Sequence, residues 1–134
     1  MLNSARYLKA HQLSTGKLGI TGFCWGGSTT NYLAVTLGAD IHAGVPFYGA
    51  AAETSGVPSI KAPLLIHYAE NDERINAMWP AFETALKAAG VPHEMHKYPG
   101  TQHGFHNNST PRFDEAAAKL AWDPTIAHFK KYLA

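Results

Sequence analysis

The stretch GITGFCWGGSTTNYLAV, residues 19–35, determines both the fold and the functional site that the sequence predicts. It joins a short run of apolar and small residues, typical of a buried strand, to a helical pattern that begins with Gly26 and Gly27. The only cysteine of the chain, Cys24, lies at the junction. These residues predict a sharp turn from strand to helix with a thiol at its tip.

The pattern Gly22-Phe23-Cys24-Trp25-Gly26 has the form of a nucleophile elbow, with cysteine in place of the usual serine. We expect a side chain at either glycine to collide with the strand or the helix. The first helical turn aims backbone N–H groups at the sulfur and favours the thiolate, the reactive form. The Trp25 N–H is placed to donate to an oxyanion. A buried structural cysteine is the alternative, and the glycine pair favours the nucleophile.

Strand-like and helix-like patterns alternate along the rest of the chain. Strands are predicted at residues 17–23, 43–49, 63–69 and 93–99, and helices at residues 2–12, 25–37, 77–89 and 114–133. This alternation predicts an α/β fold with about four mostly parallel strands flanked by helices. We expect one domain over residues 1–134, with an N-terminal helical segment at 1–16 and the core at 17–134.

Three local features carry more specific expectations. Ser4 is the candidate N-cap of the first helix. Pro124 predicts either a kink in the last helix or the start of a second helix with Asp123 as its N-cap. Residues 50–62 show no clear helical pattern, so we expect an irregular loop or a single short turn there.

A nucleophile elbow predicts an acid and then a histidine later in the chain. Asp72 follows the strand at 63–69 in a turn, and Glu70 is the alternative acid, closer to the strand. His103 lies in a loop beyond the strand at 93–99, and His106 is the alternative histidine. An acid that orients a histidine, which in turn activates a nucleophile, is the arrangement of covalent hydrolases.

Composition and charge argue against several other classes of protein. The formal net charge is +1 and the 11 Lys and Arg residues are scattered, which predicts neither nucleic acid nor a membrane surface as partner. No apolar run can span a bilayer and no signal peptide is evident, so a cytoplasmic location is the default expectation. A single cysteine forms no internal disulfide and has no resolving partner, which disfavours a thiol redox module.

The 8 histidines raise the question of a metal site. No carboxylate or thiol has suitable local spacing beside them, so no catalytic metal is expected. His67 lies within an apolar strand pattern and is predicted to be a hydrogen-bonded core residue.

Several segments together resemble the dienelactone hydrolase family of α/β-hydrolases. They are GFCWGG at 22–27, VPFYG at 45–49, YAENDERI at 68–75 and YPGTQHGFH at 98–106. The resemblance covers most of the chain from Lys17 onward. It implies a triad of Cys24, His103 and Asp72 that hydrolyses small esters or lactones through a thioester acyl-enzyme, with no cofactor. The side chains expected around the substrate are those of Trp25, Phe47, Tyr48, Phe105 and His106.

The resemblance extends only to the later portion of the family pattern. The strand at 17–23 corresponds to the family's central strand, and the earlier strands beside it are not found in this sequence. The early loop with the second oxyanion-hole N–H, an early glutamate and an early arginine are not found either. We therefore expect an unpaired edge at strand 17–23, covered by a second copy in a two-fold homodimer. The alternative to an esterase or lactonase is a non-catalytic remnant that acts as a binding or interaction module.

Overall fold

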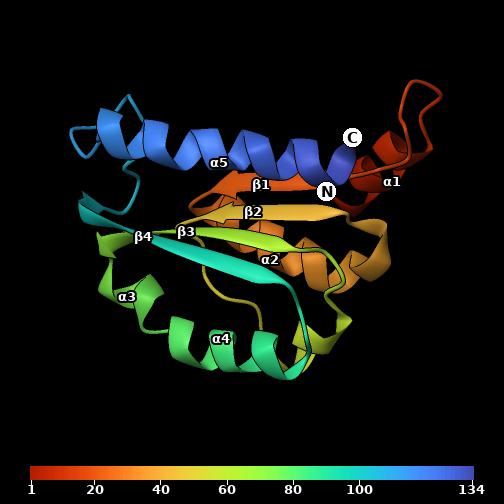
Figure 1. The fold of residues 1–134 in the computed structure, drawn as a ribbon, viewed down its shortest axis with the longest axis horizontal. Helices are drawn as coiled ribbons and strands as arrows, with labels where there is room; N and C mark the ends of the chain where they lie inside the picture. Colours follow the sequence, from red (N-terminus) through yellow and green to blue (C-terminus); the bar gives the residue numbers. More distant parts are fainter.

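The computed structural model describes residues 1–134 and contains one four-stranded sheet in the order β1-β2-β3-β4 (Figure 1). The strands are β1 (Gly19–Phe23), β2 (Ala43–Phe47), β3 (Leu64–Asn71) and β4 (His93–Gln102). Each strand runs parallel to its neighbour. The predicted α/β fold is confirmed, and β1 lies at one edge of the sheet with no strand beyond it.

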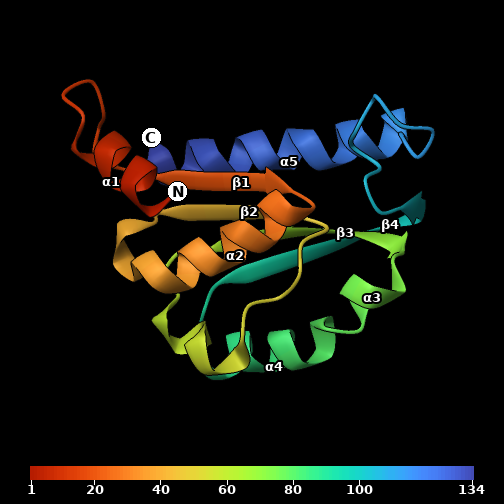
Figure 2. The ribbon, with the colours of Figure 1, turned by 180° about the vertical axis from the view of Figure 1, so that it is seen from behind.

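The helices form a layer on each face of the sheet. Figures 1 and 2 show α5 (Glu115–Leu133) along one face and α2 (Trp25–Leu37) and α4 (Trp79–Ala88) on the other. The helix α1 (Leu2–Ala10) lies at one end of the sheet, where the two chain termini also meet. The short α3 (Glu73–Asn76) follows β3 directly. None of these helices has the length and apolar character needed to cross a bilayer.

Burial on both faces explains why the strand patterns read as continuously apolar. In β3, Leu64, Ile66 and Tyr68 belong to the buried cluster that packs with α4. Leu65 and Ala69 alternate with them and belong to the cluster beneath α5. A parallel sheet covered by helices on both sides requires apolar side chains in both directions, because neither face meets water.

Two sequence expectations about local structure were wrong or incomplete, and two short elements were not predicted. Ser4 lies inside α1, and Met1 occupies the N-cap position without a side-chain hydrogen bond. The crossing at residues 50–62 contains a six-residue 3-10 helix, η2 (Thr54–Ser59), which is more regular than expected. A second short 3-10 helix, η1 (Gly38–Asp40), and the helix α3 had no sequence signal that we recognised.

The break predicted at Pro124 is wrong, because α5 is one continuous helix through this residue. Asp114 is the N-cap of α5 and its side chain accepts a hydrogen bond from the Ala117 N–H at 2.9 Å. Asp123 caps no second helix and instead forms an ion pair with Lys119 at 2.9 Å. An interior proline costs about 3 kcal/mol in an exposed helix, so packing against the sheet must offset this. The buried Ala117, Ala118 and Ala121 supply that packing.

His67 is the hydrogen-bonded core residue that the sequence predicts. Its ring is fully buried, with Nε2 3.0 Å from the Thr125 hydroxyl of α5 and Nδ1 2.9 Å from the Tyr98 hydroxyl of β4. Burial, reinforced by nearby His96, lowers the pKa of His67 to about 3. The side chain is therefore neutral in the folded protein at every pH near neutrality, and it joins β3, β4 and α5.

We predict that this histidine makes the fold sensitive to mild acid. Below pH about 6.5 the unfolded chain binds a proton at His67 and the folded chain does not. The free energy of unfolding should then fall by about 1.4 kcal/mol per pH unit from this residue alone, until the pH nears its folded pKa. Urea denaturation at several pH values between about 4.5 and 6 gives the free energy of unfolding as a function of pH, and its slope against pH should be shallower in H67N than in wild type, whatever the absolute stability of the variant. Equal slopes in wild type and H67N would contradict the assignment.

Candidate active site

The turn between β1 and α2 places Cys24 in a backbone conformation that L-residues rarely adopt. Its φ is 57° and its ψ is −115°, and the helix begins at the next residue, Trp25. The Cys24 N–H donates to the Phe47 carbonyl at 3.1 Å, and the Ser28 N–H donates to the Cys24 carbonyl at 3.1 Å. These two bonds hold the strained residue between β2 and the first turn of α2, with its side chain exposed.

The two elbow glycines differ in what they contribute. A Cβ at Gly22 would lie 2.3 Å from the Gly26 carbonyl oxygen, so the turn closes only with glycine there. A Cβ at Gly26 would meet open space, so the expected collision at Gly26 is wrong. The second close approach is at Gly27, whose Cβ would lie 2.4 Å from the Phe47 carbonyl oxygen. The glycines at 22 and 27 therefore bring the helix against the sheet.

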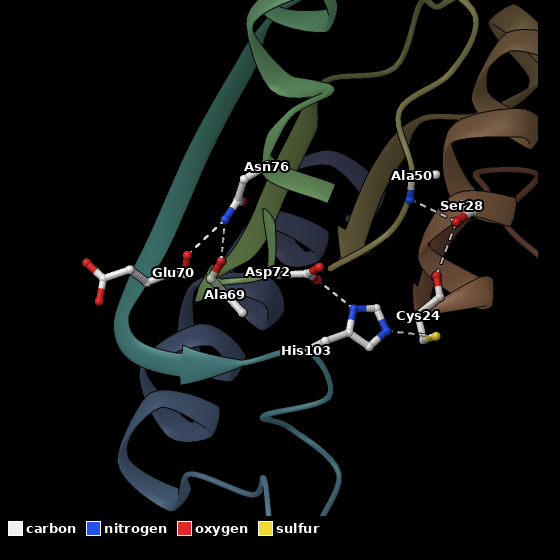
Figure 3. A network of polar contacts seen from close by, with 8 residues as sticks. All are labelled: Cys24, Ser28, Ala50, Ala69, Glu70, Asp72, Asn76 and His103. Carbon is white, nitrogen blue, oxygen red and sulfur yellow. Dashed lines mark hydrogen bonds and ion pairs between the residues drawn. The ribbon is translucent and has the colours of Figure 1, made fainter. Parts of the chain in front are cut away.

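The structure brings the three expected polar side chains into one chain of contacts, which Figure 3 shows from close by. His103 Nε2 lies 2.9 Å from the Cys24 sulfur, and His103 Nδ1 lies 2.6 Å from Asp72 Oδ2. The Asp72 carboxylate is nearly buried, the His103 ring is less exposed than the thiol, and the thiol faces solvent. The arrangement can transfer a proton between sulfur and imidazole while the carboxylate holds the ring.

The alternative acid and histidine lie elsewhere. Glu70 accepts a hydrogen bond from the Gly100 N–H at 2.7 Å and makes no contact with His103 (Figure 3). Asn76 of α3 donates to the carbonyls of Ala69 and Glu70, which fixes the chain just before Asp72. His106 packs against Phe23 at 5.0 Å between ring centroids. Of the two acids and two histidines, Asp72 and His103 are the pair that reaches the thiol.

A cavity of about 460 Å³, the catalytic cavity, opens beside the thiol. Its wall comes from the ends of β1 and β2 and from the loop after β4. The lining residues are Phe23, Cys24, Tyr48, His103, Gly104, His106, Asn107, Asn108 and Arg112. Tyr48 and His106 therefore line it as expected.

Three residues expected around the substrate are placed elsewhere by the structure. The Trp25 side chain is 69% exposed and lies in a groove beside the open edge of β1, although its N–H belongs to the elbow. Phe47 and Phe105 are fully buried in the core beneath α5. They back the cavity without lining it, because strand periodicity turns Phe47 into the core and the loop turns Phe105 inward.

The electrostatic character of the cavity comes from Tyr48 and Arg112. Tyr48 has a φ of 35°, a strained conformation for a bulky residue, and burial raises its pKa to about 12. Its hydroxyl is therefore protonated and can act as a donor. Arg112 forms no ion pair and would be 3.6 Å from a Cβ on Gly104. A cation in the wall favours negative charge on a bound molecule.

Sequence reasoning missed five lining residues: Phe23, Gly104, Asn107, Asn108 and Arg112. The last three belong to the irregular segment after His103, where no periodicity indicates which side chains point inward. Phe23 had a usable signal, because it directly precedes the nucleophile in the elbow. No cluster of three or more His, Cys, Asp or Glu side chains is arranged to hold a metal ion.

Comparison with known proteins gives one consistent match. The model of the dienelactone hydrolase family matches residues 1–133. Protein usf of Aquifex pyrophilus is 37% identical over 124 residues, which are 90% of this chain and 53% of that protein. The human carboxymethylenebutenolidase homolog is 32% identical over 106 residues, with 75% of this chain and 41% of that protein covered.

A solved structure agrees with these relatives. A candidate dienelactone hydrolase from Klebsiella pneumoniae has a TM-score of 0.86 and 28% identity, over 96% of this chain and 58% of that one. The chain thus spans about half the length of the relatives that it matches.

We predict opposite effects for alanine at the two elbow glycines. G22A forces strand and helix apart and should lower the free energy of unfolding by about 1–3 kcal/mol. G26A meets open space at the start of a helix and should be neutral or stabilising, by up to about 1 kcal/mol. Urea denaturation of both variants is the measurement, and a G26A protein as unstable as G22A would refute this account of the turn.

Proposed function

Because the chain belongs to the dienelactone hydrolase family, we propose that it hydrolyses small carboxylic esters or lactones with Cys24 as the nucleophile. The observation that carries the proposal is the position of His103, which contacts both the sulfur and the Asp72 carboxylate. The exposed thiol opens into a cavity of suitable size for a small molecule. The mechanism needs no cofactor.

In the first half of the reaction, the Cys24 thiolate attacks the carbonyl carbon and a C–S bond forms. The carbonyl oxygen takes the negative charge and accepts a hydrogen bond from the Trp25 N–H, which has no acceptor within the helix at its first position. His103, protonated at Nε2, gives that proton to the alcohol oxygen as the C–O bond breaks. The products of this half are a thioester and a free alcohol.

In the second half, water replaces the alcohol. His103 removes a proton from water, the oxygen attacks the thioester carbon, and the C–S bond breaks to return the thiolate. Asp72 accepts the Nδ1–H of His103 in both halves, which keeps Nε2 directed at the sulfur and stabilises the charged ring. The products are a carboxylic acid and the resting enzyme.

We predict measurable turnover of p-nitrophenyl acetate that depends on this triad. C24A should lose all activity above background, and D72N should lose about 100-fold or more in kcat because His103 loses its orientation. E70Q is the matched control, because Glu70 lies two residues away and does not touch His103, and it should stay within about twofold of wild type. Circular dichroism confirms that each variant is folded.

Two outcomes would contradict the esterase proposal. A single burst of about one nitrophenolate per chain without turnover would support the non-catalytic remnant, which binds but does not release. Full activity in C24A would exclude the cysteine as nucleophile.

We further propose that a second copy of the chain covers the edge of β1 in a two-fold homodimer. This edge carries an apolar groove, the β1 groove, of about 310 Å³ between α1 and α2. Large exposed side chains along it are Met1, Leu8 and Trp25. An unpaired apolar edge is a site for strand pairing between chains. A second N–H donor at the oxyanion would come from the partner, and loss of one such donor costs about 2.7–4 kcal/mol of transition-state stabilisation.

Light scattering should therefore give the mass of a dimer for wild type. W25A removes the most exposed ring of the β1 groove and should shift the protein towards monomer, with activity per chain that rises with protein concentration. Y32A is the control, because Tyr32 is a similarly exposed ring on the same helix but outside the groove. A wild-type monomer at all concentrations would end the dimer proposal and leave the triad proposal untouched.

A further inference from the structure

A second hollow, the side hollow, adjoins the catalytic cavity. It has a volume of about 520 Å³ and lies between the loop after β4 and the first half of α5. His106 and Asn108 line both the side hollow and the catalytic cavity. A molecule bound at Cys24 can therefore extend past His106 without leaving the protein surface.

Aromatic rings follow this path from one hollow to the other. The centroid of the Phe23 ring lies 5.0 Å from that of His106, and the centroid of the Trp122 ring lies 5.6 Å from it. Phe113 lines the side hollow as well, and Phe113 and Trp122 are 38% and 39% exposed. Single exposed apolar side chains are common. Here Phe113 and Trp122 share one hollow with the His106 ring, which also lines the catalytic cavity. Together the three rings form a surface for a flat apolar group.

The polar groups of the side hollow favour an uncharged ligand. Lys119 and Asp123 pair with each other at 2.9 Å, so they neutralise the rim. The His106 ring packs against Phe23 and Trp122, and its Nε2 is buried, so that atom offers no donor or acceptor to a molecule in the side hollow.

We propose that the side hollow is a binding subsite for an aromatic group on the alcohol side of the ester substrate. The inference rests on the proposed ester hydrolysis and names its substrate class. His103 gives its proton to the alcohol oxygen, so the alcohol lies against the loop that begins at His103. His106 belongs to that same loop, three residues later, and the side hollow opens behind it. The acyl group, by contrast, remains attached to Cys24 after the alcohol leaves.

The test measures how removal of the Trp122 ring changes kcat/KM for three esters. W122A should lower kcat/KM for phenyl acetate about fivefold. The kcat/KM of W122A for methyl acetate, and for methyl phenylacetate with its ring on the acyl side, should stay within twofold of wild type. W122F keeps a ring and should recover most of the loss. L120A is the matched control, because Leu120 lies on the same helix, is 66% exposed and does not line the side hollow.

Binding of phenol, the alcohol product, separates this inference from the catalytic proposal. An NMR titration on the C24A protein needs no turnover, and the added W122A change should weaken phenol binding about fivefold while L120A does not. If W122A weakens phenol binding but the wild-type protein has no esterase activity, the proposed reaction is wrong and the aromatic binding site remains supported. Turnover of phenyl acetate that is unaffected by W122A, or an equal loss with methyl phenylacetate, would overturn the subsite. A change of molecular mass in W122A would instead assign the side hollow to contact between copies, and would also overturn it.

Discussion

The hydrogen bond from the Cys24 N–H to the Phe47 carbonyl is the interaction on which the site depends. It continues the parallel pairing of β1 with β2 by one residue, and the absence of a side chain at Gly27 lets α2 lie close to the same Phe47 carbonyl. The same close approach positions the first turn of α2, which begins directly after Cys24. The strained conformation of Cys24 is therefore maintained by main-chain contacts from two strands and a helix.

Parallel strands bring the remaining groups to the same edge. Cys24, Tyr48, Asp72 and His103 are each the first residue after a strand, following β1, β2, β3 and β4 in turn. Because all four strands point the same way, residues separated by up to 79 positions meet within hydrogen-bonding distance. On the same sheet, the His67 network joins β3, β4 and α5 beneath this edge, so the supports of the acid and the histidine are coupled through the core.

The parts of this structure that follow simple periodicity could be predicted from the sequence, and the rest could not. The four strands, the three longer helices and the placement of Asp72 and His103 all follow from alternating apolar patterns and the elbow motif. The break or second helix expected at Pro124 is absent, because packing of the buried alanines of α5 outweighs the local preference of proline to end a helix. The inward turn of Phe105 depends on the course of irregular backbone, and the outward turn of Trp25 depends on the strained turn at Cys24 that starts α2; neither carries a periodic signal. The position of Arg112 and the lining of the side hollow depend on the loop after β4, so the sequence alone did not predict them either.

Trp25 connects the open edge of β1 with the proposed chemistry. Its N–H belongs to the elbow and its ring belongs to the β1 groove, so one residue contributes to two different surfaces. A chain packed on that groove would hold the Trp25 ring and thereby restrict the backbone of the first turn of α2. The relatives that match this chain are about twice as long, and a longer chain can provide such packing within one molecule. For this chain, packing on β1 would also determine the rigidity of the proposed oxyanion donor, because both involve Trp25.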